Sequence, residues 1–397
     1  MPSGPKCIVV GAGVLVLCAA RALTRRGWSI EVLEAGDLIG HPLSGSKGDA
    51  RIFRLGYPEP HYVEMAIAAR TLWRELEDEA GRRLLHVTGQ LSFGDAAEVD
   101  AVAHSLARHG EPAERLAQRA TRARFPAVSV WGPVLFEPGS GVLEAHACLR
   151  ALCTTTGFEV RTHTRVTALE STDNGATVRG PDGQARHADI VVDCAGPAAL
   201  ALLGPTAASA LGAPPSLPQV AYFRAAQPGS LGPARLPVFI EWGDAMIYGL
   251  PVLGSGAHAG TFKVSHHTPG PSLDLYDPTA SCAAVDDADD SAHLAALTDA
   301  VRRLLPGLDP EPVATERCVY DNSVDTDFVL DRVGNVVVGC GTSGHGFKFG
   351  PLLGELLADL ADGTASRLDL RPFRFDRLSR PGRTGPKDPD QRGSGAR

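Results

Sequence analysis

The sequence lacks several features that would place it in a class at once. Its eight cysteines form no CxxC pair, so no structural zinc site is predicted, and several lie in apolar runs typical of free thiols. The 38 Lys and Arg residues do not exceed the 46 Asp and Glu residues, so a nucleic-acid partner is not expected. No apolar run approaches the length of about 18 residues that a membrane span needs. We therefore expect a cytoplasmic protein without a metal site.

The chain has the size and composition of an ordinary globular protein. Its 397 residues, 44% of them hydrophobic and 21% charged, are enough for two or three domains with a sizeable core.

The N-terminal segment contains a dinucleotide-binding pattern. A short apolar strand, residues 6–10, is followed by the turn Gly-Ala-Gly with Gly11 and Gly13, and then by a helix-compatible stretch over residues 14–26. A second strand pattern ends at Glu34. Glycines in this turn let the backbone approach a pyrophosphate at a helix N-terminus, and a carboxylate about 20 residues on binds a ribose hydroxyl. The spacing predicts a βαβ unit that binds a dinucleotide.

Two other interpretations of this segment exist. The apolar run from Cys7 to Ala20 after Lys6 also resembles the hydrophobic part of a secretory signal, but the strand, turn, helix and terminal acid in one register favour the βαβ unit. Val16 stands where a third glycine normally allows close packing of helix on strand. Valine must push the helix outward or find a small neighbour, so a unit that keeps the fold but binds its ligand weakly is the second alternative.

Further patterns predict that dinucleotide-fold elements occur near both ends of the chain, with sheet-rich segments between them. Residues 188–194 form an apolar strand closed by Ala-Gly-Pro, and residues 335–340 form another that runs into a glycine-rich turn and an amphipathic helix over 341–360. Alternation over residues 219–264 predicts an antiparallel sheet that faces the substrate. The fold class is therefore α/β plus an antiparallel sheet, with a Rossmann-like domain interleaved with a mixed-sheet domain.

Several longer stretches resemble the flavoproteins of the D-amino-acid-oxidase family, and more narrowly its group of monomeric sarcosine, N-methyltryptophan and pipecolate oxidases. The matching stretches cover nearly all of residues 6–375 and are GAG…VLEA near the N-terminus, SGSKGDARIFRLGY (44–57), IYGLP (247–251), TFKVSHH (261–267), RCVYDNSVDTDFVLDR (317–332) and SGHGFKF (343–349). The arginine pair, the Cys-x-Tyr motif and GHGFKF are specific to that group.

The resemblance implies FAD as the cofactor, joined covalently to the protein through Cys318, where the group has a thioether to the flavin. Attack on the flavin needs a thiolate, which the neighbouring Arg317 would favour. The cofactor-binding residues that it implies are Gly11, Gly13, Glu34, Lys47, Cys318, Gly344, His345 and Gly346. For Cys318, an ordinary buried strand thiol is the alternative.

The resemblance also implies the residues of the reaction. Arg54 and Lys348 match the two cations that hold the substrate carboxylate, bidentately in the case of the guanidinium. Lys263 matches the lysine beside the flavin that promotes its reaction with oxygen, and Arg51 matches the arginine on the same flavin face. The polar residues expected to orient the substrate are Tyr248, His267 and Tyr320. The plainer interpretations are an exposed charge after a strand for Arg54 and an ordinary lysine in the first turn of a helix for Lys348. The two tyrosines and the histidine could equally be satisfied sheet residues.

Three positions depart from the family pattern, namely Val16, Lys47 in place of histidine, and Asp321 in place of threonine. The extra lysine and the extra carboxylate indicate a substrate other than sarcosine, or altered flavin attachment. The chain also has more residues than expected between Gly249 and Lys263, so the loop over residues 254–260 is predicted to reshape the pocket.

These observations together predict an FAD-dependent amine oxidase for a small secondary amino acid, with N-methyl or cyclic imino nitrogen. It would transfer hydride to the flavin, reduce O2 to H2O2 and act as a monomer. The alternatives are a dehydrogenase or tailoring oxidase for a larger amine, and a catalytically silent flavoprotein scaffold. The expected domains are an FAD-binding domain (1–85, 141–213 and 313–380), a substrate domain (86–140 and 214–312) and a disordered tail (381–397) without large apolar side chains.

Overall fold

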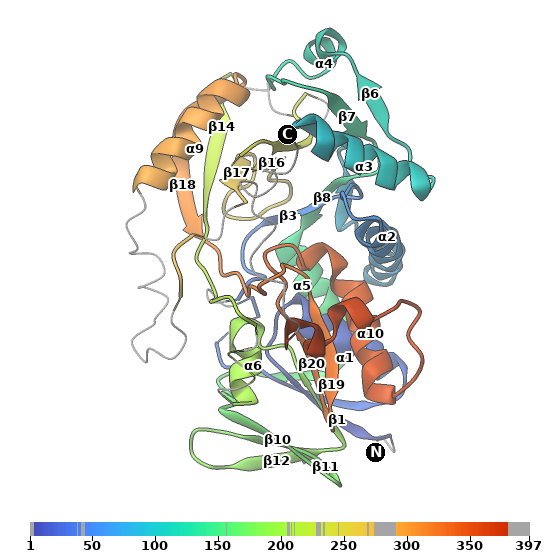
Figure 1. Cartoon of the computed structure of the whole chain (residues 1–397). Helices are drawn as coiled ribbons and strands as arrows, with labels where there is room; N and C mark the ends of the chain where they lie inside the picture. Colours follow the sequence, from blue (N-terminus) through green and yellow to red (C-terminus); the bar gives the residue numbers. More distant parts are fainter. Residues whose placement is uncertain are drawn as a thin grey trace.

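The structure is a computed structural model of the chain. It describes residues 4–37, 39–40, 44–155, 157–204, 207, 209, 211–227, 232, 235–244, 246–267, 270–273 and 291–379. Two sheet-based layers lie at opposite ends of an elongated molecule, with the parallel strands around β1 in the lower part of the view and the strands around β14 and β7 in the upper part (Figure 1). Within the described ranges, no helix is long and apolar enough to cross a membrane.

The lower layer is built on a six-stranded sheet with the order β19-β20-β13-β1-β2-β9. Five strands are parallel, and β19 pairs antiparallel to β20 at one edge. The strands are β1 (Lys6–Val10), β2 (Ser29–Leu33), β9 (Glu159–Arg161), β13 (Ile190–Asp193), β19 (Val329–Val333) and β20 (Val336–Cys340). Parallel strands buried on both faces need continuous apolar runs, and such runs are the pattern from which strands of this sheet were predicted.

Two helices from opposite ends of the chain pack together on this sheet. α1 (Val14–Arg25) follows β1, and α10 (Gly350–Asp362) follows β20 through the short 3-10 turn η2 (Phe347–Phe349). A Cβ atom at Gly354 would lie 2.5 Å from the carbonyl carbon of Cys18, and one at Gly350 would lie 2.7 Å from a methyl of Val14. The close approach of the two backbones therefore depends on these glycines.

The upper layer is an eight-stranded mixed sheet with the order β18-β14-β17-β16-β15-β5-β7-β6. Its strands are β5 (Gln90–Gly94), β6 (Glu114–Leu116), β7 (Val134–Glu137), β14 (Gln219–Ala225), β15 (Val238–Trp242), β16 (Ile247–Pro251), β17 (Phe262–His266) and β18 (Leu308–Arg317). The antiparallel sheet predicted over residues 219–264 is confirmed as β14 to β17. α9 (Ser291–Leu304) covers it with an apolar face that includes Leu297 and Val301.

Smaller elements complete the fold. A three-stranded sheet joins β3 (Ala50–Phe53), β8 (Gly141–Glu144) and β4 (Leu85–Val87), and another joins β10 (Ala168–Thr172), β11 (Gly175–Arg179) and β12 (Ala185–Ala188). The other helices and 3-10 turns are α2 (Pro60–Ala80), α3 (Ala96–Arg108), α4 (Gln118–Arg124), α5 (Ala145–Thr154), η1 (Gly196–Ala198), α6 (Ala199–Leu202), η3 (Arg371–Phe373) and η4 (Phe375–Ser379).

The strands of each large sheet come from separate parts of the sequence. The six-stranded sheet draws on residues 6–33, 159–193 and 329–340, and the eight-stranded sheet on residues 90–137 and 219–317. The domain boundary expected at residue 313 falls inside β18, which runs unbroken from Leu308 to Arg317 in the eight-stranded sheet, so a division there would cut a strand. The tail expected to be disordered, residues 381–397, lies outside the described residues.

Candidate functional site

A cavity of about 660 Å³ is lined by residues of both large sheets. From the six-stranded sheet come the turn after β1, the end of β2 and the segments after β13 and β20, and from the eight-stranded sheet come β15, β16, β17 and the chain that follows β18. The carboxyl ends of β1, β2 and β13 meet here because Val10 pairs with both Leu33 and Asp193. Ligands of open α/β sheets bind at this edge.

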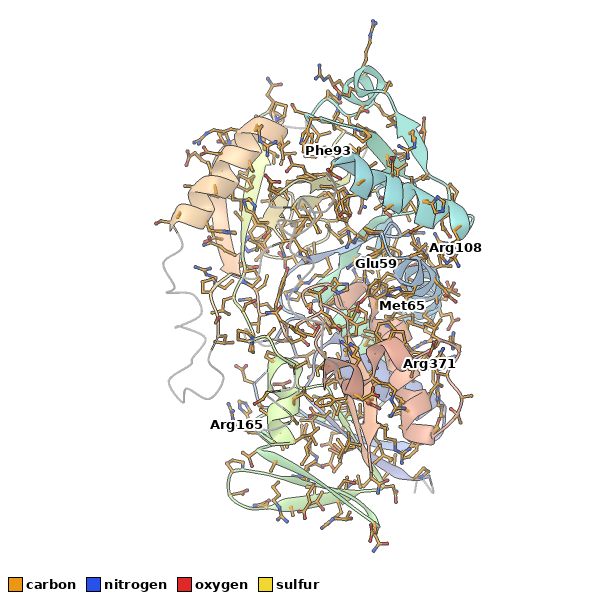
Figure 2. The ribbon with its side chains drawn as sticks, in the orientation of Figure 1. Glu59, Met65, Phe93, Arg108, Arg165 and Arg371 are labelled. Carbon is orange, nitrogen blue, oxygen red and sulfur yellow. The ribbon has the colours of Figure 1, made fainter. Side chains whose placement is uncertain are left out.

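One end of the cavity has the geometry of a dinucleotide site. Gly11 has a positive φ of 103° and donates its N–H to the Leu33 carbonyl at 2.7 Å, and a Cβ there would lie 3.1 Å from the Cys194 oxygen. The first turn of α1 faces the cavity, and the N-terminus of a helix favours an anion. Arg165 also lines this end, and Figure 2 shows it in the lower part of the molecule.

Glu34 lies where the fingerprint predicts it. Its Oε1 accepts a hydrogen bond from the Gly36 N–H at 2.7 Å, and the residue lines the cavity at the end of β2. This bond holds the carboxylate in place beside the α1 turn. The arrangement fits a carboxylate that receives ribose hydroxyl groups.

Val16 is accommodated by a small neighbour. It is fully buried in α1, and its Cγ2 methyl lies 3.2 Å from the position that a Cβ of Gly11 would take. Gly11 therefore provides space that the missing third glycine normally provides from the helix. The departure from the fingerprint leaves the turn and the start of α1 at the cavity.

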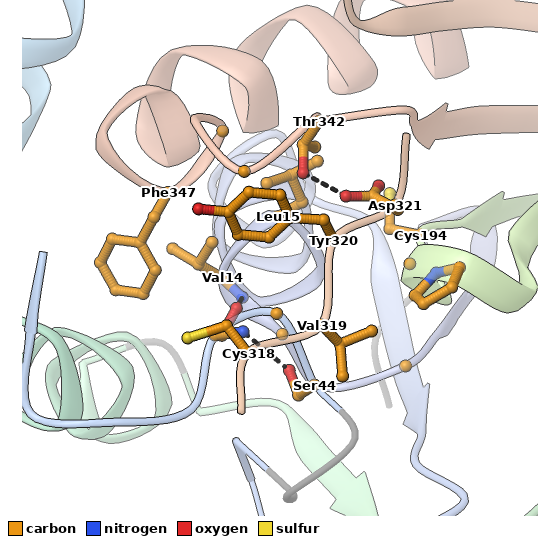
Figure 3. A pocket seen from close by; sticks show the side chains of 18 of the residues that line it. Val14, Leu15, Ser44, Cys194, Cys318, Val319, Tyr320, Asp321, Thr342 and Phe347 are labelled. Atoms are coloured by element: carbon orange, nitrogen blue, oxygen red, sulfur yellow. Dashed lines mark hydrogen bonds between the residues drawn. The ribbon is translucent and has the colours of Figure 1, made fainter. Parts of the chain in front are cut away.

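Cys318 lines the middle of the cavity, on the segment that also contains Tyr320 and Asp321 (Figure 3). It is 8% exposed. Among the thiols away from this segment, Cys7, Cys18 and Cys148 are buried, and burial raises the pKa of Cys153 to about 11. Arg317 is not among the residues that line the cavity, and its Nη1 donates to the Leu217 carbonyl at 3.1 Å. The cations that share the cavity with Cys318 are Arg51, Arg54, Arg165, Lys263 and Lys348.

The two cations predicted to bind a carboxylate do lie in one cavity. Arg54 follows β3 and stacks its guanidinium on Tyr57, with 3.8 Å from Cζ to the ring centroid. Its Nη1 is buried and has no hydrogen-bond partner among the described residues. Lys348 lies in η2, is 6% exposed and donates from Nζ to the His345 carbonyl at 3.0 Å. Burial, and next the charge of Arg54, hold the pKa of Lys348 well below its usual range. An anion between them would relieve this cost.

Three polar residues lie beside this cation pair. The His267 ring is 6.2 Å from the rings of both Tyr248 and Tyr320, measured between centroids, and all three line the cavity. Burial, together with Arg54 and Lys348, lowers the pKa of His267 to about 4, so its imidazole is neutral at neutral pH. Burial raises the pKa of both tyrosines, which keeps their hydroxyls protonated. The group can donate and accept hydrogen bonds without a charge.

A second pair of cations lines the cavity from β3 and β17. Lys263 is 3% exposed, and Arg51 has its guanidinium 5.5 Å from the Phe347 ring centroid. Nη2 of Arg51 donates to the carbonyl oxygens of Gly45 and Lys47, which fixes the guanidinium. Arg51 therefore presents its charge to the cavity in a fixed position, as stabilisation of a developing anion requires, and Lys263 brings a buried amine to the same cavity.

Some residues predicted from the sequence have other positions. Lys47 is not among the residues that line the cavity, and its backbone carbonyl holds Arg51 instead. Gly344, His345 and Gly346 do line it. A Cβ at Gly344 would lie 2.2 Å from the Tyr320 ring, so glycine is needed there, and Nε2 of His345 lies 3.1 Å from the Thr326 carbonyl oxygen.

The loop between β16 and β17, which was expected to reshape the pocket, does not line it. None of the residues between Leu250 and Lys263 lines the cavity. The loop lies against Asp49 and Glu144 instead. A Cβ built at Gly256 would be 2.1 Å from Oδ1 of Asp49, and one built at Gly254 would be 2.5 Å from Oε2 of Glu144.

The sequence analysis missed other residues of the site. Ser46 accepts the Val14 N–H at 2.9 Å and so caps the first turn of α1. Thr342 donates to the buried Asp321 carboxylate, whose pKa is raised by burial (Figure 3). SGS before Lys47 was a visible signal for the serine, whereas nothing in the sequence marked the pairing of Asp321 with a residue 21 positions later.

The fold and this cavity define a dinucleotide-binding protein with a polar, cation-lined site beside the dinucleotide end. Residues 6–360 match the model of the FAD dependent oxidoreductase family, DAO, and the chain belongs to that family. It is an FAD-dependent oxidoreductase.

The similar proteins include oxidases of amino acids. Human peroxisomal sarcosine oxidase is 33% identical over 94% of this chain and 95% of its own length. N-Methyl-L-tryptophan oxidase of Salmonella heidelberg (strain SL476) is 31% identical over 94% of this chain and 98% of its own. The structure of NikD, an unusual amino acid oxidase essential for nikkomycin biosynthesis, superposes with a TM-score of 0.75 at 26% identity, covering 94% of this chain and 97% of that chain.

Proposed function

We propose that the protein oxidises the C–N bond of a small secondary amino acid, with an N-methyl group or a cyclic imino nitrogen, to an imine. The observation that carries the proposal is the cation pair, Arg54 and Lys348, which lie in the same cavity as the dinucleotide end although they are 294 positions apart in the sequence. The relatives of this chain that are named for sarcosine and N-methyl-L-tryptophan support an amine substrate that carries a carboxylate.

The residues present fit FAD. The α1 turn and Glu34 would hold its pyrophosphate and ribose, Cys318 would attach it covalently, and Arg51 and Lys263 would face the flavin ring. FAD, when bound, takes a hydride from the carbon beside the nitrogen and passes two electrons to O2, which with two protons gives H2O2. The covalent bond, the peroxide product, the monomeric state and a cytoplasmic location are parts of this proposal.

The chain's own residues position the substrate. Arg54 and Lys348 bind the carboxylate and so fix one end of the amino acid. His267, neutral at neutral pH, is a hydrogen-bond partner for the amine that does not repel it, and the hydroxyls of Tyr248 and Tyr320 are further partners. Because an uncharged amine gives up hydride readily, the site requires no strong base. Lys263 supplies positive charge where oxygen is reduced.

The test is an anaerobic screen of the purified protein. The protein should be yellow, and N-methyl amino acids, proline or pipecolate should bleach the flavin, whereas the matching amines without a carboxylate should not. Air should then restore the colour with one H2O2 formed per imine. A colourless protein, or bleaching that ignores the carboxylate, contradicts the proposal.

The similarity to NikD favours a second candidate, a tailoring oxidase or dehydrogenase for a larger amine. The same screen separates the two. A dehydrogenase would bleach with substrate and regain colour in air slowly, without peroxide, but quickly with an artificial electron acceptor. A silent flavoprotein scaffold would bleach with no amine tested.

A further inference from the structure

Three side chains outside the cavity form one hydrogen-bonded unit, which we call the Glu316 cluster (Tyr222, His258 and Glu316). The Tyr222 hydroxyl donates to Oε2 of Glu316 at 2.6 Å, and Nε2 of His258 lies 3.1 Å from Oε1. The rings of Tyr222 and His258 stack with 3.9 Å between centroids and 22° between planes. Each carboxylate oxygen therefore has its own partner, and the two partners hold each other in place.

The cluster lies on the face of the sheet from which Lys263 reaches the cavity. Tyr222 on β14 is directly opposite Lys263 on β17, and Val220, two residues earlier, is opposite Glu316 on β18. Directly opposed residues and residues two apart on a strand share a face. Nζ of Lys263 lies 5.8 Å from the Tyr222 ring centroid, so lysine and carboxylate flank the same ring.

Arg51 also lies next to this carboxylate. A Cβ built at Gly48 would be 3.4 Å from Nη1 of Arg51 and 3.6 Å from Oε2 of Glu316. Glu316 is thus placed behind both cations that line the cavity from β3 and β17, and it does not line the cavity itself.

The loop between β16 and β17 carries His258 and places it in the Glu316 cluster. The His258 N–H donates to Oδ2 of Asp49 at 2.8 Å, which docks the loop on the start of β3. His146 of α5 lies on the other side of Asp49, with 3.5 Å from Nδ1 to Oδ1. The loop therefore influences the cavity through a carboxylate rather than by lining it.

The electrostatics give Glu316 a specific task. Burial, and then the charge of Arg51, lower the pKa of Lys263, while Cys318, Glu316 and Asp49 act to raise it. A cysteine in a thioether carries no charge, so covalent attachment of the flavin would remove the Cys318 contribution. Of the groups that favour a charged lysine, Glu316 and Asp49 would then remain, and Asp49 is engaged with the loop.

We propose that Glu316 is the counter-ion that keeps Lys263 charged inside the protein, and that His258 is the positioning residue that fixes this carboxylate. The inference rests on the proposed function, in which Lys263 faces the flavin. It adds to that function a control of oxygen reactivity by groups that touch neither substrate nor cavity.

Binding of sulfite to the flavin tests the proposal without turnover. Sulfite adds to oxidised flavin, and the negative charge that the adduct places on the ring is stabilised by a nearby cation. In the wild type, sulfite affinity should be high while Lys263 is charged and should fall as pH rises through the pKa of Lys263. Lys263→Met should remove this pH step. Glu316→Gln, which keeps the acceptor for Tyr222, should move the midpoint to lower pH by about one unit or more, with about tenfold weaker binding above the wild-type midpoint.

Variants of the histidines distinguish positioning from general damage. His258→Ala should shift the midpoint in the same direction as Glu316→Gln, and His258→Gln, which keeps an N–H donor, should restore it. His146→Gln is the matched control, because His146 contacts Asp49 but not Glu316, and should leave the midpoint in place. Tyr222→Phe removes one hydrogen-bond donor to Glu316, and it replaces Glu316→Gln in the midpoint measurement if that variant fails to retain flavin.

The outcomes separate this inference from the proposed function. A Lys263→Met protein that keeps the pH step contradicts the role of Lys263 and with it the proposed oxygen site. Loss of the step in Lys263→Met together with an unshifted midpoint in Glu316→Gln, or in Tyr222→Phe where that variant is used, overturns the counter-ion proposal alone. Equal midpoints for His258→Ala and wild type overturn the role of His258.

Discussion

Substitution of the cation pair is the strongest test of the substrate site. Arg54 has a buried Nη1 without a partner among the described residues, and the Lys348 ammonium bonds a backbone carbonyl at 3.0 Å. Removing one partner of a buried, hydrogen-bonded charge pair costs about 2–5 kcal/mol, or roughly 30-fold to several thousand-fold in affinity. We expect Lys348→Met and Arg54→Gln each to weaken binding of the amino acid within that range, and to abolish discrimination against the amine that lacks the carboxylate.

The two losses should not add. Both cations contact one anion, and each disfavours the charge of the other, since Arg54 contributes to the lowered pKa of Lys348. A double variant should therefore bind the substrate better than the sum of the single losses predicts. Additive losses would mean that the residues do not share a ligand group.

The same pair predicts a pH dependence with a definite sign. A bound carboxylate favours the charged lysine and raises its pKa from the depressed value in the free protein. At a pH between the two pKa values, Lys348 must take up a proton when the substrate binds, so its contribution makes affinity fall as pH rises, and the difference from Lys348→Met measures that contribution. Lys348→Met should bind weakly with no such proton uptake.

Anaerobic titration of flavin bleaching, with proton uptake followed by a pH indicator, measures both effects. Lys6→Met is the matched control, because Lys6 pairs with Glu31 at 3.2 Å outside the cavity and its loss should change neither quantity. The reasoning is refuted if the affinity for the amino acid, measured by flavin bleaching, is the same in Lys348→Met as in the wild type.

Three further predictions concern other parts of the site. FAD should stay with the polypeptide after denaturation, and Cys318→Ser should release it while the fold, followed by circular dichroism, is kept; a wild type that releases all its flavin contradicts the attachment. In that Cys318→Ser background, Glu34→Ala should weaken FAD binding by about 1.5–3 kcal/mol in equilibrium titrations, as for a lost charged hydrogen bond, and unchanged affinity would place the ribose elsewhere. Burial raises the pKa of Asp193 to about 8, above its unfolded value, so the carboxyl is protonated in the folded state and its contribution to stability declines as pH rises from the unfolded pKa toward 8. Asp193→Asn should therefore gain stability relative to wild type over that range by up to about 1.4 kcal/mol per pH unit in urea unfolding, and a difference that does not vary with pH would show that the residue is not protonated as expected.

The sequence predicted the elements of the site well where a local pattern determines them. The βαβ unit, with Gly11 and Glu34, and the strand and helix around Gly346 follow from apolar periodicity and glycine turns, and all are present in the structure. The resemblance to a family supplied the residues that meet in the cavity, including Arg54 and Lys348.

The rest depends on which strands become neighbours. Period-2 alternation indicates the face on which a side chain lies, but it does not say that β14 pairs with both β17 and β18. The contact of Tyr222 with Glu316, 94 positions away, was therefore not predictable from local pattern. The position of Lys47 outside the cavity lining has a different reason: its backbone carbonyl, which any residue would provide, is the group that contacts Arg51.

The glycine-mediated contact between α1 and α10 has a consequence for synthesis of the chain. α1 is synthesised early, but the helix against which it packs ends at Asp362. The apolar surface of α1 therefore stays uncovered in the nascent chain until α10 has been made. Contacts of such sequence separation slow folding and leave intermediates open to aggregation. We expect chains that stop before α10 to be degraded or held by chaperones, and the flavin to be acquired only after α10 has been made.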